Sequence, residues 1–401
     1  MGNGNQPKIT PATLRRAIAK GEFFYFYQPI VSLETGEICG AEALLRWKHA
    51  DGTITLPDAF IPFAESTENI LDLTLETLPY LMADLKQIHA IAPSSSIHFN
   101  VSSVVLKTND LAGLFSENLA SSGIAPGTFH VEIVESLFMP PVPKAEETIE
   151  TLVSKGIPVV LDDFSAGYTT LKILSRLPLT AIKLDLNIVQ QAAISKTDFR
   201  VLRHLVSMGH QLDLKIIAEG IETEEMYDLI LSTGATSAQG YYFSHPLPLS
   251  DFLTMLQNSP TWSNYPFGLE YLAQIDLVDF RRDVIRAALT IHKYAQGGIR
   301  QHAFAMLPEL DYRKNRLGRW ISGIGKKWEG TPGFERLLQA HRKMHETAQD
   351  LIQAALHDEH SEIIFQFIGT LSNLSNQIAG FLEELELNGL VKHYKSPTSY
   401  D

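Results

Sequence analysis

The feature that most constrains the fold of this chain is a repeated alternation of strand-like and helical segments between residues 23 and 245. Eight apolar runs have the character of buried strands, and stretches with apolar residues at helical spacing separate most of them. This alternation predicts a mostly parallel sheet, and eight units suit a closed (β/α)8 barrel. An open doubly wound sheet is the alternative, but no GxGxxG motif follows any run. The runs are EFFYFYQPIV, ICGAEALLRW, SIHFNVS, FHVEIVE, IPVVLDDF, AIKLDL, LKIIAEGI and AQGYYF.

The alternation ends near residue 258, and a different pattern follows. Residues 258–268 contain two prolines and several turn formers, which is typical of a linker. Beyond them the chain has long helical patterns without strand-like runs, so we expect a bundle of about four helices. The predicted organisation is a barrel over residues 1–257, a linker over 258–268, a helical bundle over 269–390 and a frayed tail over 391–401.

Polar residues stand at the carboxyl ends of the strand-like runs, where a barrel of this kind has its active site. An isolated aspartate after a strand is usually a helix cap or a turn residue. Several carboxylates that converge on one mouth are instead what a pair of hard divalent cations requires. The residues concerned are Glu42, Arg46, Asn100, Glu132, Glu135, Asp162, Asp163, Lys183, Asp185, Glu219, Glu222 and Gln239.

Asp162 and Asp163 are adjacent carboxylates that follow the apolar run Val159–Leu161. Like charges this close repel each other, and burial strengthens the repulsion. Successive strand residues point to opposite faces, so both aspartates can share a site only where the strand is ending. There one could bridge two cations while the other binds one. Two cations ~3.5–4 Å apart form the arrangement used for phosphodiester displacement.

Short motifs recur through the barrel region in a fixed order. YQPI and AEALLRW come first, and FNVS, VEIVES, DDFSAGYTTL, IKLDLNIV, IAEGIETEE and AQGYYFSHPLP follow. In this order they resemble the EAL-type cyclic-di-GMP phosphodiesterases over about residues 10–255. The resemblance implies hydrolysis of one phosphodiester of cyclic-di-GMP to linear pGpG with two Mg2+ or Mn2+ ions.

The resemblance also assigns roles to individual residues. The implied ligands of the first cation are Glu42, Asn100, Glu132 and Asp162, and those of the second are Asp162, Asp163 and Glu219. Lys183 would position or deprotonate the attacking water, and the implied catalytic residues are Lys183, Glu42 and Glu219. The implied substrate-binding residues are Gln28, Leu44, Arg46, Asp185, Glu222, Gln239 and Pro246.

Two positions concern the loop after the paired aspartates. Glu135 matches the family residue that anchors this loop. Ser165 stands where the family usually has glycine. If that position needs a positive φ, serine costs on the order of 1 kcal/mol. We therefore expect a mild perturbation of the loop and retained activity.

His341 and His345 share one helix face, as two imidazoles that bind one metal do. A bare HxxxH is more often two packed or solvated histidines. Upstream of this pair stand His292 and the sequence RLGRW at 316–320. With these residues the helical region resembles the chemoreceptor zinc-binding domain over about residues 280–385, and the resemblance implies that His292 is the early ligand.

Asn315 departs from this family because it occupies the position of a cysteine. A thiolate is a charged, soft ligand, whereas an amide is neutral and hard. Three histidines with a water could still bind Zn2+ at weaker affinity. The domain is therefore either a weakened zinc sensor or a relic that only dimerises. Cys39, the single cysteine, lies in the barrel and is predicted to be a small buried hydrophobe.

Composition limits the remaining alternatives. A net charge of −13 argues against a protein that coats a nucleic acid polymer. One cysteine, no signal-peptide pattern and no run of ~18 apolar residues predict a cytoplasmic protein without a membrane span. The alternative function is a non-catalytic cyclic-di-GMP receptor whose helical domain signals by dimerisation. The complete set of implied ligands favours a phosphodiesterase, with a homodimer as the expected assembly and regulation through the helical domain.

Overall fold

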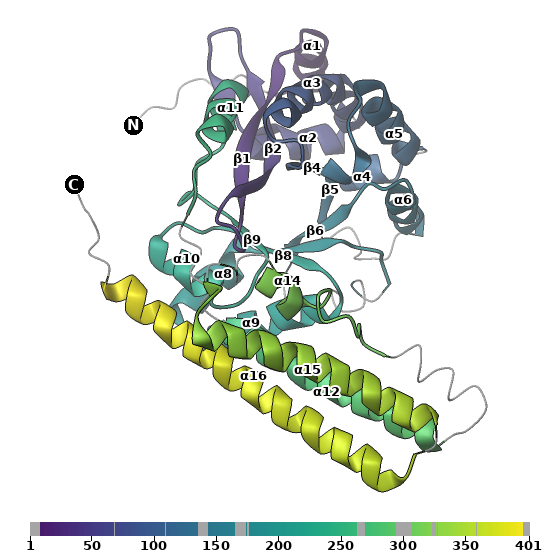
Figure 1. The fold of residues 1–401 in the computed structure, drawn as a ribbon. Helices are drawn as coiled ribbons and strands as arrows, with labels where there is room; N and C mark the ends of the chain where they lie inside the picture. Colours follow the sequence, from purple (N-terminus) through teal and green to yellow (C-terminus); the bar gives the residue numbers. More distant parts are fainter. Residues whose placement is uncertain are drawn as a thin grey trace. The chain divides into compact units, whose positions relative to one another are not determined.

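The computed structural model describes residues 9–67, 69–108, 110–134, 143–164, 174, 176–262, 269–293, 307–322, 326, 328–357 and 359–395. The chain forms two compact units. The first comprises residues 1–230 and 235–264, and the second comprises residues 265–401 together with 231–234. We call them the barrel unit and the helical unit, and Figure 1 shows their elements.

The barrel unit is built on one sheet whose strands close into a ring. The strands are β1 (Phe23–Ser32), β2 (Ile38–Lys48), β3 (Ile54–Thr55), β4 (Ser96–Asn100), β5 (Phe129–Val134), β6 (Val159–Phe164), β7 (Ala181–Leu184), β8 (Lys215–Ala218), β9 (Ser237–Gln239) and β10 (Leu247–Pro248). The order is β10-β1-β9-β8-β7-β6-β5-β4-β2-β3, and pairing of β1 with β2 closes the ring of eight strands. The short strands β3 and β10 extend it at β2 and β1. The predicted eight-stranded barrel is confirmed.

Within the ring of eight strands, β1 runs against the other seven. β1 pairs antiparallel with both β2 and β9, whereas β2, β4 and the ring strands that follow, through β9, pair in parallel. A tight turn connects β1 to β2, with Gly36 at φ 70°. A connection this short can join only antiparallel strands, since a parallel crossover needs a dozen residues or more. The prediction of a mostly parallel sheet therefore holds, with β1 as the exception in the ring; the short strands β3 and β10 also pair antiparallel, with β2 and β1.

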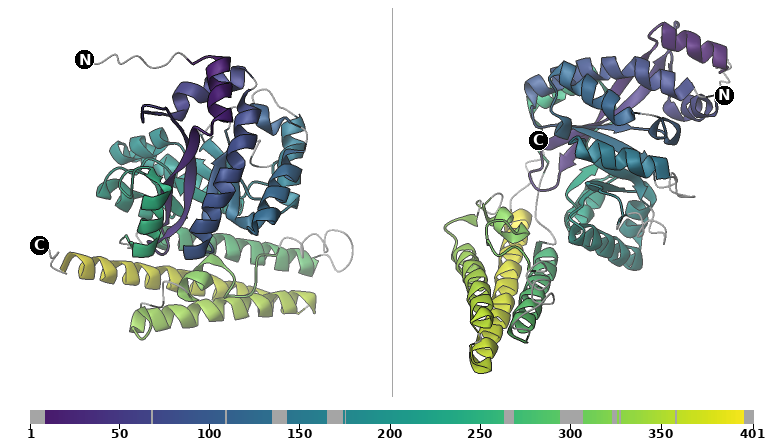
Figure 2. Two further views of the ribbon diagram at one scale, coloured as in Figure 1. Left: turned by 90° about the horizontal axis from the view of Figure 1, so that it is seen from above. Right: turned by 90° about the vertical axis from the view of Figure 1, so that its right-hand side faces the viewer.

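Helices cover the outside of the barrel, as Figures 1 and 2 show. They are α1 (Pro11–Ala19), α2 (Pro57–Ser66), α3 (Asn69–Ile91), α4 (Ser103–Leu106), α5 (Leu111–Ser122), α6 (Pro143–Ser154), α8 (Leu186–Ile194), α9 (Lys196–Gln211), α10 (Glu224–Leu231) and α11 (Leu249–Asn258). α3 illustrates why they form: Leu73, Leu78, Leu81 and Leu85 are buried at spacings of three to five residues. This amphipathic stripe packs on the sheet and leaves the polar face in solvent.

Part of the barrel interior below the strand ends is apolar. Ile30, Val160, Ala181 and Ile217 form a buried cluster there, with Cys39 packed against it. Cys39 is partly buried, and its thiol lies 3.4 Å from the Ile30 carbonyl oxygen. The side chains above this layer are polar, so the change of chemistry along each strand marks the mouth.

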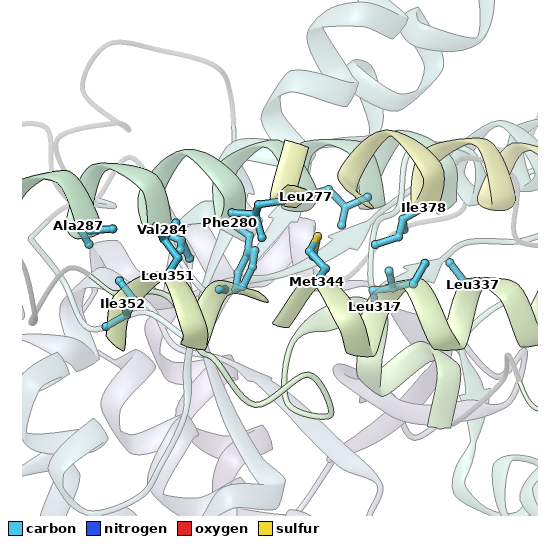
Figure 3. Close-up of a cluster of buried hydrophobic side chains, with 14 of the residues drawn as sticks. Leu277, Phe280, Val284, Ala287, Leu317, Leu337, Met344, Leu351, Ile352 and Ile378 are labelled. Carbon is cyan, nitrogen blue, oxygen red and sulfur yellow. The ribbon is translucent and has the colours of Figure 1, made fainter. Parts of the chain in front are cut away.

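In the part of the helical unit that the structure describes, three long helices and a short one are present. They are α12 (Leu269–Lys293), α14 (Arg316–Ser322), α15 (Pro332–Leu356) and α16 (Ser361–Lys395). Figure 2 shows the long helices side by side, and Figure 3 shows apolar side chains of α12, such as Phe280 and Val284, facing Met344 and Leu351 of α15. This unit therefore has its own hydrophobic core. Among the described residues, none of the helices is both long and apolar enough to cross a membrane.

Candidate active site

The candidate site lies where the strands of the barrel unit end. Strand pairing places Gln28 of β1 beside Glu42 of β2, and Asn100 of β4 beside Glu132 of β5. Parallel strands present their carboxyl ends at one edge, so side chains far apart in sequence meet there. The other site residues on or next to strands are Asp162 and Asp163 of β6, Lys183 of β7, Glu219 after β8 and Gln239 of β9.

Lys183 stands at the centre of the site, where its side chain is only 1% exposed. Its Nζ lies 3.0 Å from Glu42 Oε2 and 2.7 Å from Glu219 Oε1. It also lies 3.2 Å from Glu132 Oε2 and 3.5 Å from Asp162 Oδ1. One ammonium thus faces four carboxylates, which leaves a surplus of negative charge when all four are ionised.

The pKa values follow from this crowding. Burial opposes the charged form of Lys183, but the surrounding carboxylates outweigh burial and raise its pKa well above the ordinary value. Burial raises the pKa of Glu219 to about 8 and that of Glu132 well above its ordinary value, although Lys183 opposes both shifts. The carboxylates therefore lack positive charge, and additional cations would allow all of them to ionise.

Glu42 is held by three donors. The Asn100 amide donates to Oε1 at 2.6 Å, while Lys183 and the Gln239 amide donate to Oε2 at 3.0 and 2.8 Å. These donors outweigh burial and lower the pKa of Glu42. The Gln239 amide also lies 2.9 Å from Gln28 Oε1. The carbonyl oxygen Oε1 of Gln239 is buried without a hydrogen-bond partner among the described residues, so the network has a vacant acceptor.

Asp162 and Asp163 reach the same site through an irregularity in β6. The pairing of β6 with β7 shifts register between Leu161 and Phe164. Asp163 has φ 54°, a left-handed conformation that is uncommon outside glycine, and its N–H donates to Asp162 Oδ1 at 2.9 Å. As the run IPVVLDDF predicts, β6 ends at Phe164, directly after the two aspartates, and the bulge turns the second carboxylate.

The donor set fits divalent cations. A ligand atom from each of Asp162, Asp163 and Glu219 lies within 4.8 Å of the others. Carboxylate oxygens of Glu42 and Glu132 lie 3.0 and 3.2 Å from the Lys183 ammonium, which also contacts Glu219. All of these donors are oxygens, which hard cations such as Mg2+ and Mn2+ prefer. The surplus negative charge and the vacant Gln239 oxygen are consistent with bound cations.

A cavity of about 700 Å3 opens beside the carboxylates. Asn100, Asp162 and Asp163 line it on one side, Leu44 lies on its wall, and Asp58 and Ile61 of α2 line another part. This volume is within the range of small-molecule sites.

The other predicted substrate residues occupy different positions. Arg46 is buried, donates to the Leu45 carbonyl at 2.9 Å and lies 5.3 Å from the Phe26 ring centre; burial lowers its pKa. Asp185 caps α8 by accepting the Asn187 N–H at 2.8 Å. Glu222 is exposed and Pro246 is half-buried. Among the described residues, the cavity wall does not include Gln28, Arg46, Asp185, Glu222, Gln239 or Pro246. Glu135 and Ser165 lie outside the described residues.

One residue of the site, His98, was not predicted from the sequence. His98 Nδ1 lies 2.8 Å from Glu132 Oε1, inside the barrel. It precedes Asn100 by two residues on β4 and so points to the same face. Extending the period of two inward from each strand end could have found it.

The helical unit brings three of the four predicted zinc residues together. The Asn315 amide nitrogen lies 3.0 Å from His341 Nε2 and 2.8 Å from His345 Nε2, and both histidines are buried. Its oxygen accepts the Gly318 N–H at 2.7 Å, which caps α14. His345 Nδ1 lies 3.0 Å from the Leu310 carbonyl, so His345 accepts at Nε2. His341 also accepts from the Asn315 amide at Nε2, but its Nδ1 is buried without a hydrogen-bond partner among the described residues.

His292 does not join this cluster, contrary to the expectation of four converging ligands. The His345 ring lies 4.4 Å from that of Phe280, which is on the same helix as His292. His292 follows Phe280 by twelve residues, or about 18 Å along a helix. The spacing of apolar residues correctly placed His292 on a helix, α12. It gave no information on the position of His292 along the helix axis relative to His341 and His345.

Comparison with known proteins identifies relatives of the barrel unit. A family model described as EAL domain matches residues 12–246. The uncharacterized protein sll1895 of Synechocystis sp. is 32% identical over 248 residues, covering 61% of this chain and 35% of that protein. The cyclic di-GMP phosphodiesterase PdeL of Escherichia coli is 31% identical over 251 residues, covering 61% of this chain and 68% of PdeL.

A solved structure shows the same architecture. The structure described as PaMucR phosphodiesterase in complex with c-di-GMP superposes with a TM-score of 0.56 and 28% identity, covering 60% of this chain and 98% of that one. The matched part of this chain spans about a third of the length of two curated relatives, 35% of sll1895 and 33% of YkoW of Bacillus subtilis.

Proposed function

Because the chain belongs to the EAL domain family, we propose that it hydrolyses one phosphodiester bond of cyclic di-GMP and releases linear pGpG. The observation that carries the proposal is the convergence of four carboxylates on the buried ammonium of Lys183. The names of relatives support the substrate, since PdeL is a cyclic di-GMP phosphodiesterase. In the reaction a water oxygen attacks phosphorus, the bond to the 3′ oxygen breaks, and that oxygen takes up a proton.

Two divalent cations, Mg2+ or Mn2+, would activate the water and stabilise the charge that develops on the phosphate when they are bound. Glu42, Asn100, Glu132 and Asp162 would hold the first, and Asp162, Asp163 and Glu219 would hold the second. The all-oxygen donor set and the surplus negative charge support this assignment.

Lys183 is proposed to hold the attacking water as a hydrogen-bond donor. Without bound cations the surrounding carboxylates raise the pKa of Lys183, and in its charged form the ammonium can donate a hydrogen bond but cannot accept a proton. Burial prevents it from reaching bulk solvent, so its orientation is fixed by the carboxylates around it. We therefore favour positioning over deprotonation as its role.

The substrate is proposed to lie across the mouth and the adjoining cavity. Leu44 and the residues of α2 line the apolar part, which suits a purine base. Arg46 carries a fork of donors that matches a phosphate oxygen, and its partner in the present structure, a neighbouring carbonyl, is replaceable.

The decisive experiment is incubation of the purified full chain with cyclic di-GMP and Mg2+ or Mn2+, followed by chromatography of the products. We expect linear pGpG with either ion and none in EDTA. Ca2+ should not support turnover, because it is larger and less demanding in geometry. Equal turnover in EDTA would contradict the cation assignment, and bound but unhydrolysed nucleotide would leave the receptor function.

The helical unit is proposed to regulate the barrel unit and to mediate homodimerisation. Its separate hydrophobic core supports an independent module. For the zinc site, the hydrogen bonds of Asn315 to both imidazoles favour a metal-free cluster in this chain. The two Nε2 atoms nevertheless face one point, so a suitable ligand at position 315 would allow a metal to bind.

A further inference from the structure

His98 is a buried polar side chain in the layer below the carboxylates. Its β4 position is two residues inward from Asn100, on the same face of the strand. The neighbouring part of this layer is apolar and consists of Ile30, Val160, Ala181 and Ile217. An imidazole that is 2% exposed in such a place is costly unless both nitrogens are satisfied.

Both ring nitrogens have partners. Nδ1 lies 2.8 Å from Glu132 Oε1, and Nε2 lies 3.3 Å from the Ser96 hydroxyl. When the Glu132 carboxylate is ionised it can only accept, so Nδ1 carries the proton, and Nε2 accepts from the Ser96 hydroxyl, whose other acceptor is the Cys39 carbonyl at 3.5 Å. His98 is thus a donor to Glu132, from below.

Glu132 divides its carboxylate between two donors. Oε1 accepts from His98, and Oε2 accepts from Lys183 at 3.2 Å. The carboxylate is buried, so it cannot rotate about its terminal bond without losing the His98 hydrogen bond away from solvent. His98 therefore keeps Oε2 turned toward the mouth, where the cations are proposed to bind.

We propose that His98 is a positioning residue for divalent-cation binding, acting through Glu132. The inference rests on the proposed function, because it takes Glu132 as a cation ligand. Removing a hydrogen-bonding partner of a metal ligand typically costs about 10- to 100-fold in metal affinity or activity.

The test compares Mn2+ binding to the full chain, by calorimetric titration without nucleotide, across matched variants. His98→Leu keeps an apolar side chain in the layer but removes the donor. His98→Asn places an amide nitrogen where Nδ1 stands. His130→Leu is the control, because His130 pairs with His98 across β4 and β5 with rings 4.6 Å apart, but its Nε2 contacts the Gly127 carbonyl.

We expect His98→Leu to weaken Mn2+ binding about 10- to 100-fold, His98→Asn to recover most of the affinity, and His130→Leu to bind as wild type does. In steady-state assays, His98→Leu should need more Mn2+ for half-maximal kcat while KM for cyclic di-GMP stays unchanged. Wild-type Mn2+ affinity in His98→Leu, or equal loss in His98→Leu and His98→Asn, would overturn the inference and make His98 a packing residue.

Two further outcomes are separable. If His98→Leu does not fold, as judged by circular dichroism, His98→Asn is compared with His98→Gln, whose amide stands nearer Ser96; tighter Mn2+ binding by the asparagine variant supports the inference, and equal binding overturns it. If wild type binds Mn2+ without hydrolysing cyclic di-GMP, the proposed activity fails and the binding comparison still decides the role of His98.

Discussion

Lowering the pH from 7.5 to 5.0 should destabilise the helical unit through His341. Burial, with a smaller effect of His345, lowers the pKa of His341 from 6.5 to about 3. Because the folded pKa is below the unfolded one, the contribution to stability is complete above about pH 6.5 and is lost as the pH falls toward 3. Protonation would also place a second hydrogen on an imidazole whose Nε2 accepts from Asn315.

The magnitude follows from the two pKa values. At pH 5.0 the unfolded imidazole is almost fully protonated and the folded one is still neutral, so His341 alone accounts for about 2 kcal/mol of lost stability relative to pH 7.5. His341→Gln keeps an acceptor for Asn315 but does not titrate. Its free energy of opening should fall by about 2 kcal/mol less than that of wild type over the same pH range.

The assay is hydrogen exchange of the α15 amides, resolved by mass spectrometry in EDTA. Comparing variant with wild type at each pH cancels the intrinsic dependence of exchange on pH. His360→Gln is the matched control, because His360 is an exposed histidine of the same unit. An equal loss of protection in wild type and His341→Gln would refute the reasoning, since it would mean that His341 titrates alike in the folded and unfolded chain.

Further predictions concern the two sites. Glu42→Ala and Asp162→Asn should each abolish turnover, because each removes a proposed cation ligand. If a variant keeps more than about a tenth of the wild-type rate, which corresponds to ~1.4 kcal/mol of barrier, the substituted residue is not a direct ligand. Lys183→Ala should lower kcat strongly and leave nucleotide binding intact; a raised KM with unchanged kcat, measured at saturating Mn2+, would reassign the lysine to ground-state binding. Asn315→Cys should bind Zn2+ more tightly than wild type in a competition titration with a chelator, because a thiolate adds a negative charge and a softer donor. His341→Ala in that background should remove the gain in affinity. An Asn315→Cys variant with the Zn2+ affinity of wild type would mean that these residues cannot form a metal site.

Much of the barrel could be predicted from sequence because its strands are buried on both faces and its helices on one. The two burial patterns give different spacings of apolar residues, and both spacings can be recognised in the amino-acid sequence. The antiparallel direction of β1 could not be read this way, since an apolar run looks the same in either direction. The short turn at Gly36 was the available signal.

The candidate site was predictable only where residues cluster at strand ends. That rule found Glu42, Lys183 and Glu219, which the structure brings together. It missed His98, which lies inside the barrel, below the layer of carboxylates. It also did not predict which residues of the other helices lie level with His292 along α12. Such positions depend on tertiary register, which the local pattern does not encode.

The left-handed backbone of Asp163 has a consequence for how this protein can lose activity. The conformation costs roughly 1 kcal/mol for a residue other than glycine, and the neighbouring Asp162 adds repulsion, which together with burial raises the pKa of Asp163. Asparagine tolerates the same conformation without the charge. In a lineage no longer under selection for turnover, Asp163→Asn would therefore be accepted without a loss of stability. This single substitution would give a stable barrel that no longer hydrolyses its substrate.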